Sequence, residues 1–352
     1  MKRHVWGLIL LIAWSLAPPA GLAAAGSGTY SFQDLGALGG SSRGIQSQAA
    51  AIKTVDSQPV VAGGSQIKLN GNWHAFSHSG SAMTNLGTLQ SENAGNSQAT
   101  AINLVNSEVV VVGWSEVAYN HQHAFSYSGS AGPMIDLGTL GGTHSLANGI
   151  NESGTVVGWS YTASFAPHAF LKPWGGAMQD LGTLGGSQSM ATAINASGQV
   201  VGWAQTKAGE RHAFLREPGG SPQDLVTMAG GQSCATAINA SGQIVGWVLS
   251  SYGFRAFYRN PGEPMQDLGA GGGSQSVANG INAGGQIVGW FANSGGDWRA
   301  FVKDPGGPIK DLNSLVPGLP ANVTLKSASA ISDGGHIVGL TSSDHAFLLT
   351  PQ

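Results

Sequence analysis

The sequence consists of short runs of small, β-branched and aromatic residues separated by polar, glycine-rich stretches. The segment Ala191–Phe214, ATAINASGQVVGWAQTKAGERHAF, is representative. Its turn at Asn195–Gly198 suits a tight hairpin, because Asn can bond its own backbone and Gly can adopt a positive φ. From Tyr30 onward no window has the sustained spacing of three and four apolar residues that a helix needs. The pattern predicts an all-β chain.

One unit of this pattern contains four strands, which we call a, b, c and d in chain order. A second turn at Pro218–Gly220 separates c from d. In the representative unit we expect strand a at Ala191–Asn195, b at Gln199–Trp203, c at His212–Leu215 and d at Gln223–Leu225.

Three landmarks recur seven times each and define the repeat. HAF or RAF recurs every 43 to 49 residues, and the other two landmarks are DLG, or a close variant, and AxxI. HAF or RAF begins at His74, His123, His168, His212, Arg255, Arg299 and His345. A period near 44 with four short strands is typical of a β-propeller blade.

Two features favour a closed seven-bladed β-propeller of four-stranded blades over an open solenoid. Strand a carries small residues such as Ala191 and Ala193, as expected where inner strands converge on one axis. The chain also begins with a lone d-type strand, Tyr30–Leu35, and ends with strands a, b and c. We expect the N-terminal strand to join the last blade, because this pairing closes the ring and removes open edges.

Residues 1–25 have the pattern of a signal peptide. Lys2 and Arg3 precede the apolar run VWGLILLIAWSLA, and Ala23–Ala25 fits a small-residue cleavage site. The alternative is a retained membrane anchor. We expect residues 26–352 to form a single propeller domain, secreted or periplasmic, monomeric and without membrane contact after cleavage.

Composition and charge narrow the classes of partner. The chain has 55 Gly, and only 9% of its residues are charged, which is the reverse of a disordered chain. Without residues 1–25 it carries 13 Lys and Arg against 18 Asp and Glu, a formal charge of −5. This sign argues against a nucleic-acid partner. The single cysteine, Cys234, is expected to be a small buried residue.

HAF, DLGTLGG and INxxGQIVGW together resemble the HAF-repeat family of bacterial extracellular repeat proteins. The resemblance covers essentially the whole chain after the N-terminal segment. It implies an exported repeat protein and no particular reaction or ligand. The first unit departs from the pattern: Lys53–Asp56 replaces the usual turn, and Gly63-Gly64 replaces Gly-Trp.

The five histidines of the HAF position could suggest a metal or acid–base device. Arginine occupies the same position at Arg255 and Arg299, and Arg neither ligates metals nor acts as a base near neutral pH. His and Arg share the ability to donate a hydrogen bond. We therefore expect a structural tie in each blade, to the Asp of DLG or to a buried carbonyl, and no metal.

A tryptophan ends strand b in five units, and its ring could either pack between blades or stack on a sugar. We favour packing, because aromatic burial contributes strongly to protein cores. The five are Trp114, Trp159, Trp203, Trp247 and Trp290; Gly64 and Leu340 replace them in the first and last units.

The loops between strands b and c differ most between units, and they emerge on the same face as the loops between successive blades. Variable loops on a rigid scaffold are a common binding arrangement. The candidate ligand-binding residues are Trp73, Tyr119, Tyr161, Tyr252 and Trp298. The leading hypothesis is a non-enzymatic scaffold that binds an unknown protein or polysaccharide. The alternatives are an enzyme with its site in the central channel, and a surface structural protein without a discrete ligand.

No catalytic residue or cofactor is predicted. Gly40–Gly44 matches G-x-S-x-G, but it lies in a Gly/Ser-rich stretch before a strand, whereas the nucleophile elbow needs a strand, a sharp turn and a helix. General acid–base chemistry needs a titratable group in place, and the a strands carry mostly Ala, Gly, Ser, Thr and Asn.

Overall fold

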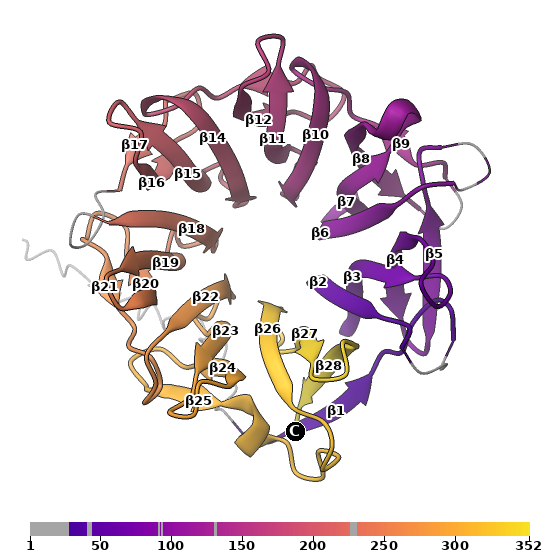
Figure 1. The fold of residues 1–352 in the computed structure, drawn as a ribbon, viewed down its shortest axis with the longest axis vertical. Helices are drawn as coiled ribbons and strands as arrows, with labels where there is room; N and C mark the ends of the chain where they lie inside the picture. Colours follow the sequence, from indigo (N-terminus) through magenta and orange to yellow (C-terminus); the bar gives the residue numbers. More distant parts are fainter. Residues whose placement is uncertain (1–27, 41–43, 91, 93, 130–131, 226–230) are drawn as a thin grey trace, which may run out of the picture.

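Seven four-stranded antiparallel sheets form a closed ring in the computed structural model (Figure 1). The structure describes residues 28–40, 44–90, 92, 94–129, 132–225 and 231–352. The predicted signal peptide and the centre of the G-x-S-x-G match lie outside the described residues. The seven-bladed β-propeller predicted from the repeat is confirmed.

The blades follow one another in chain order. Blade 1 holds β2 (Ser47–Val55), β3 (Gln58–Gln66), β4 (Trp73–Ser79) and β5 (Ala82–Gly87), and blade 2 holds β6 (Ser97–Val105), β7 (Glu108–Glu116), β8 (Gln122–Ser128) and β9 (Ile135–Asp136). Blade 3 holds β10 (Gly141–Ile150), β11 (Val156–Thr162), β12 (Pro167–Lys172) and β13 (Gln179–Asp180). Blade 4 holds β14 (Gly185–Ile194), β15 (Val200–Thr206), β16 (Arg211–Arg216) and β17 (Gln223–Asp224).

Blade 5 holds β18 (Gln232–Ile238), β19 (Ile244–Ser250), β20 (Gly253–Arg259) and β21 (Gln266–Asp267). Blade 6 holds β22 (Ser276–Ile281), β23 (Ile287–Ala292), β24 (Trp298–Lys303) and β25 (Ile309–Asp311). Blade 7 is completed from both ends of the chain: β26 (Leu325–Ile331), β27 (Ile337–Thr341), β28 (Ala346–Pro351) and β1 (Tyr30–Asp34).

The N-terminal strand closes the ring as predicted. Strand β1 pairs antiparallel with β28 from Tyr30↔Pro351 to Asp34↔Phe347, and the two strands lie side by side in Figure 1. A hydrophobic cluster then joins blade 7 to blade 1, with Val338 and Leu348 packed together with Ile52 and Phe76. The last blade is therefore bonded to the start of the chain and packed against the first blade.

The seven inner strands surround the central opening in Figure 1, and small side chains allow them to approach closely. A Cβ atom added to Gly280 would lie 3.3 Å from the Cα of Ala330 in the next blade. Larger side chains at such positions would push neighbouring blades apart, which explains the Ala and Gly residues of strand a.

The phenylalanine of each HAF or RAF fills the core between consecutive blades. All seven are fully buried: Phe76, Phe125, Phe170, Phe214, Phe257, Phe301 and Phe347. Phe214 belongs to a cluster that includes Val157 and Ala169 of the preceding blade. The repeat thus buries its largest apolar side chain at every blade-to-blade contact, where aromatic burial contributes most.

The turns between strands a and b link neighbouring blades through an asparagine. The Oδ1 of Asn195 accepts a hydrogen bond from the Gln199 N–H at 3.0 Å, and its Nδ2 donates to the Asn239 carbonyl of the next blade at 3.1 Å. The expectation for the first blade was wrong in detail. Residues Lys53–Val55 belong to β2, and a two-residue turn at Asp56 and Ser57, with φ of 47° and 64°, replaces the longer turn.

Connections between strands b and c, and those between successive blades, emerge on one side of the ring, which we call the b–c face. Turns between strands a and b and between c and d lie on the opposite face. Within the described part of the chain, no helix is long and apolar enough to cross a membrane.

Candidate functional site

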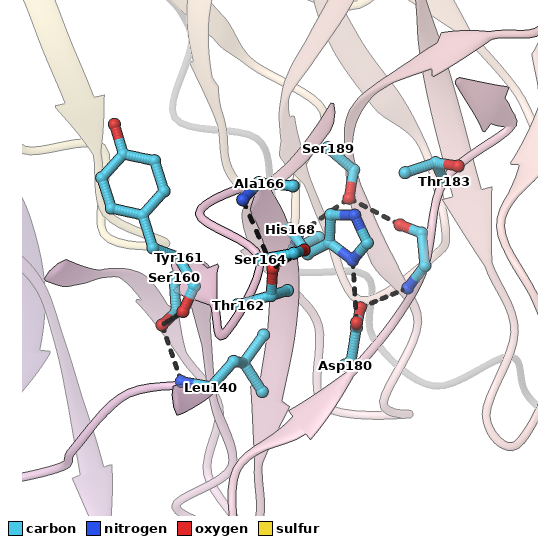
Figure 2. Close-up of polar contacts among 12 residues, drawn as sticks. Leu140, Ser160, Tyr161, Thr162, Ser164, Ala166, His168, Asp180, Thr183 and Ser189 are labelled. Carbon is cyan, nitrogen blue, oxygen red and sulfur yellow. Dashed lines mark hydrogen bonds and ion pairs between the residues drawn. The ribbon is translucent and has the colours of Figure 1, made fainter. Parts of the chain in front are cut away.

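In six of the seven blades, the HAF or RAF position is tied to the DLG position of the same blade. His168 Nδ1 lies 2.7 Å from Asp180 Oδ2, and this contact is drawn in Figure 2. Arginine makes the same contact, with Arg255 Nη2 donating to Asp267 Oδ2 at 2.9 Å. The equivalent pairs are His74–Asn85, His123–Asp136 and His212–Asp224, and His345–Asp34 joins the two ends of the chain. These side chains are engaged in holding strand c to strand d.

In blade 2, the carboxylate of this tie is stabilised in its ionised form. Burial opposes the ionisation of Asp136, but hydrogen bonds from His123 and from the Gly138 N–H outweigh it, and the pKa of Asp136 is lowered. Asp136 therefore accepts hydrogen bonds as an anion at neutral pH.

A serine that sequence reasoning missed binds six of the seven blades to the blade before each of them. The Ala169 N–H donates to Ser189 Oγ at 2.8 Å, and the Ser189 hydroxyl donates to the Gly182 carbonyl at 2.5 Å. Figure 2 shows Ser189 beside the His168–Asp180 pair. Ser47, Ser97, Ser145 and Ser276 make the same two contacts in their blades.

The strand-b tryptophans are half-buried, and side chains near the b–c loops cover four of them. The Arg211 guanidinium lies 4.5 Å from the centre of the Trp203 ring. Tyr161 packs edge-on against Trp159, Phe254 packs edge-on against Trp247, and Trp298 stacks on Trp290. In the first blade, where Gly64 replaces tryptophan, a Cβ on Gly64 would lie 3.3 Å from Trp73.

The five candidate ligand-binding residues come from five different blades of the b–c face. Tyr252 is 84% exposed and Trp298 is 56% exposed. Trp73 and Tyr161 are half-buried against the b-strand positions described above. Tyr119 lies in the short 3₁₀ helix Ala118–Asn120. Among the candidates whose side-chain exposure the structure describes, Tyr252 and Trp298 offer the most accessible aromatic surface.

The b–c face also exposes two apolar residues outside the candidate set. Leu69 and Phe165 lie in b–c loops and are exposed. Among the described residues, four of the six exposed large hydrophobic side chains belong to this face, and Ile135 and Trp174 are the other two. The b–c face therefore carries most of the exposed large apolar side chains of the described residues.

A groove lies on the b–c face between blades 6 and 7. It has a volume of about 710 Å³ and is lined by Asp297, Trp298, Arg299, Thr324, Lys326, Ser327, Leu340, Ser342 and Asp344. A second hollow of about 480 Å³ shares Trp298, Ser327 and Leu340 with it and reaches inner-strand residues of blades 1 and 2. The groove therefore runs from the rim toward the central channel.

Charged groups lie in the groove and not in the adjoining hollow. Asp297 and Asp344 each lie near a cation, with Asp297 Oδ2 3.9 Å from Arg299 Nη2 and Asp344 Oδ1 3.7 Å from Lys326 Nζ. The residues that line the hollow are Gln48, Ala49, Ala50, Gln98, Asn279, Trp290, Trp298, Ser327, Ser329 and Leu340. Each carboxylate also accepts one long hydrogen bond, Asp297 from Asn293 at 3.3 Å and Asp344 from Gln46 at 3.4 Å, which leaves further acceptor positions on both.

The described part of the chain contains neither a metal-binding cluster nor a reactive thiol. No group of three or more His, Cys, Asp or Glu side chains there is arranged to hold a metal ion. Burial raises the pKa of the Cys234 thiol to about 12, so this group is neutral and unreactive near neutral pH.

No protein-family model and no curated protein matches the sequence. Solved structures share the fold: a Mycobacterium tuberculosis puromycin-hydrolyzing peptidase has a TM-score of 0.58 at 12% identity, covering 89% of this chain and 52% of that one. Prolyl oligopeptidase B from Galerina marginata has a TM-score of 0.54 at 8% identity, covering 85% and 47%. The BP39L lectin from Burkholderia pseudomallei has a TM-score of 0.50 at 11% identity, covering 88% and 99%.

The chain spans about half the length of the two peptidases and nearly the whole length of the lectin. At these identities the likeness concerns the propeller fold. The same fold therefore occurs both in enzymes and in a lectin, and it does not decide between catalysis and binding.

Proposed function

We propose that this protein is a non-enzymatic, extracytoplasmic scaffold that binds a polysaccharide or a protein through its b–c face. The proposal rests on the difference between the repeated side chains and the variable ones. The repeated His, Arg, Ser and Asn residues hold strands and blades together. The variable residues of the b–c face, Tyr252 and Trp298 above all, are left exposed.

The location rests on the N-terminal segment and on the resemblance to HAF-repeat proteins, to which we propose this chain belongs. Export would place the propeller beside surface polysaccharides and secreted proteins, and its formal charge of −5 without residues 1–25 disfavours nucleic acid. N-terminal sequencing of the exported product should find cleavage near Ala25. Full-length protein recovered only from membranes would contradict the proposed location.

The binding function is tested with a glycan array and a protein array. A Tyr252→Ala/Trp298→Ala variant should lose the signals that the wild type gives, because exposed aromatic side chains contribute disproportionately to binding. The matched control is Trp174→Ala, which removes a tryptophan of similar exposure, 51%, from the opposite face. Wild-type protein that binds nothing on either array would overturn the scaffold function.

The groove between blades 6 and 7 favours one second candidate, glycoside hydrolysis. Two carboxylates, Asp297 and Asp344, line the same groove, and glycosidases commonly use a carboxylate pair. Release of reducing ends from a bound polysaccharide, abolished in both Asp297→Asn and Asp344→Asn, would establish this activity. Binding without release, retained in the Asn variants, would establish the scaffold.

A further inference from the structure

The repeat is broken at the junction between blades 6 and 7. After β25 the chain forms a short 3₁₀ helix, Leu312–Leu315, and continues to residue 324 before β26 begins. In blade 6 the bridging serine, Ser276, pairs with Phe291. The equivalent pair in blade 7 is Leu325 with Thr341, so blade 7 lacks the bridging serine. The consensus positions of a repeat protein maintain its fold. A position that departs from the consensus is therefore free to serve another function.

Arg299 does not make the contact with the DLG-position carboxylate that Arg255 makes. In blade 6, Asn313 stands where five of the other six blades have the Gly of DLG, and its side-chain amide as well as its N–H donates to Asp311 Oδ1, at 2.7 and 2.9 Å, at the start of the 3₁₀ helix. The ion pair of Arg299 is with Asp297, at 3.9 Å, and both residues line the groove. A guanidinium that is structural in blade 5 is thus available to a ligand in blade 6.

Lys326 reaches the groove through a β-bulge. The register of β26 against β27 shifts between Leu325 and Ser327, so Lys326 is an extra residue without a partner in the ladder. Bulges re-aim a side chain relative to a regular strand. The ammonium group lines the groove with Asp344, which lies 3.7 Å away.

Trp298 forms one wall of the groove as a supported aromatic platform. Its ring stacks on Trp290 with centroids 4.9 Å apart and an interplanar angle of 20°. Leu340 replaces the strand-b tryptophan in blade 7 and also lines the groove, so the smaller side chain leaves space in front of the platform. A rigid ring, held in place from behind, can stack against an incoming ring at little entropic cost.

We propose that this groove binds a neutral sugar ring of a polysaccharide, an inference that rests on the scaffold function proposed above. Trp298 would stack on the apolar face of the sugar, while Arg299 and Lys326 donate hydrogen bonds to hydroxyls and Asp297 and Asp344 accept them. The two cations and two carboxylates cancel, which matches hydroxyl groups that both donate and accept and disfavours a uronic acid. The volume of about 710 Å³ lies within the range of small-ligand pockets, about 300 to 1,000 Å³.

The test is affinity gel electrophoresis in neutral polysaccharides (dextran, mannan, galactan, xylan) and acidic ones (alginate, polygalacturonate). At least one neutral polysaccharide should retard the wild type. Trp298→Ala should weaken that retardation at least tenfold, Trp298→Phe should restore most of it, and Arg299→Gln should weaken it without changing the thermal midpoint. Trp174→Ala is the control and should behave as the wild type.

Each contrary outcome separates the two proposals. Retardation equal in wild type and Trp298→Ala would overturn the groove as the site and leave the scaffold function standing. Retardation by acidic polysaccharides alone would overturn the neutral ligand class. A wild type that binds none of the polysaccharides would overturn the groove proposal, and the protein array would then decide the scaffold function separately.

Discussion

At the residue scale, histidine and arginine are interchangeable in the HAF position because the position needs a hydrogen-bond donor and not a base. The Nδ1 of His168 and the Nη2 of Arg255 approach the corresponding Asp oxygens to 2.7 and 2.9 Å. Two chemically different hydrogen-bond donors therefore meet the carboxylate of the DLG position in the same register. An exchange within this position should be milder than its loss.

His168→Ala should lower the free energy of unfolding by about 1 kcal/mol, since the tie is partly solvent-exposed. His168→Arg should lose less, and Asp180→Ala combined with His168→Ala should be less destabilising than the sum of the two changes. Urea unfolding of the wild type, the three single variants and the double variant measures these values. Additive effects, or an Arg variant as unstable as the Ala variant, would contradict a direct tie.

Stability should fall as the pH drops below the ordinary histidine pKa of 6.5, because burial and the nearby His121 and His123 lower the pKa of His144. The unfolded chain then takes up a proton that folded His144 resists, so this contribution is complete above pH 6.5 and is lost as the pH falls toward the lowered value. Thermal midpoints at pH 8, 6 and 5 should show a smaller decline for His144→Gln than for wild type. Equal declines would exclude His144 from the effect.

The role of a single residue could be predicted only where the seven repeats carry different residues at its position. The alternation of His and Arg in one position is enough to indicate a hydrogen-bond donor. Arg255 and Arg299 both stand in RAF, but Arg255 is followed by Asp267-Leu-Gly and Arg299 by Asp311-Leu-Asn. That the Asn313 side chain bonds the Asp311 carboxylate while Arg299 lies beside Asp297 depends on tertiary structure and could not be predicted from this difference.

At the element scale, the serine bridge explains why successive blades hold a fixed orientation. Its residue stands two positions before the Ala of AxxI in six units, at Ser47, Ser97, Ser145, Ser189, Ser233 and Ser276. The signal was therefore present in the sequence, but a serine in a Gly/Ser-rich stretch resembles loop composition. Its importance comes from the buried backbone groups that it satisfies in the preceding blade.

Ser189→Ala should destabilise the protein by about 1 to 3 kcal/mol, because the buried Ala169 N–H loses its acceptor. The matched control is Ser187→Ala on the same strand, where the exposed hydroxyl bonds the Gln205 side chain at 2.9 Å and should matter little. Hydrogen exchange of the Ala169 amide would show whether the loss is local. Unchanged protection of this amide in Ser189→Ala would contradict the bridge.

At the scale of the whole molecule, the offset ends of the sequence were enough to predict how the ring closes, whereas the groove beside that closure could not be predicted. The closure follows from a count of strands. The groove depends on the long connection before β26, on Leu340 in place of tryptophan and on the bulge at Lys326, whose combined shape no periodicity describes.

The ring should also close in circular permutants, in which the chain starts at a different strand, provided that the strand that closes the ring is long enough. The ends already meet, since the Gln352 N–H donates to the Thr29 carbonyl at 3.0 Å, so a short linker can join residues 352 and 28. Opening the joined chain in the c–d turn of blade 1 makes β5 the closing strand, and opening it in the c–d turn of blade 4 makes β17 the closing strand. Strand β5 pairs with its neighbour at five positions, as β1 does, whereas β17 pairs at two.

Because a non-covalent closure depends on this pairing, the blade 1 permutant should keep a thermal midpoint close to that of the native chain. The blade 4 permutant should unfold at a lower temperature and expose the edge of β16 to association. Calorimetry and light scattering of the two permutants provide the comparison. A blade 4 permutant that is as stable and as monomeric as the blade 1 permutant would show that packing between blades, and not the outer strand, keeps the ring closed.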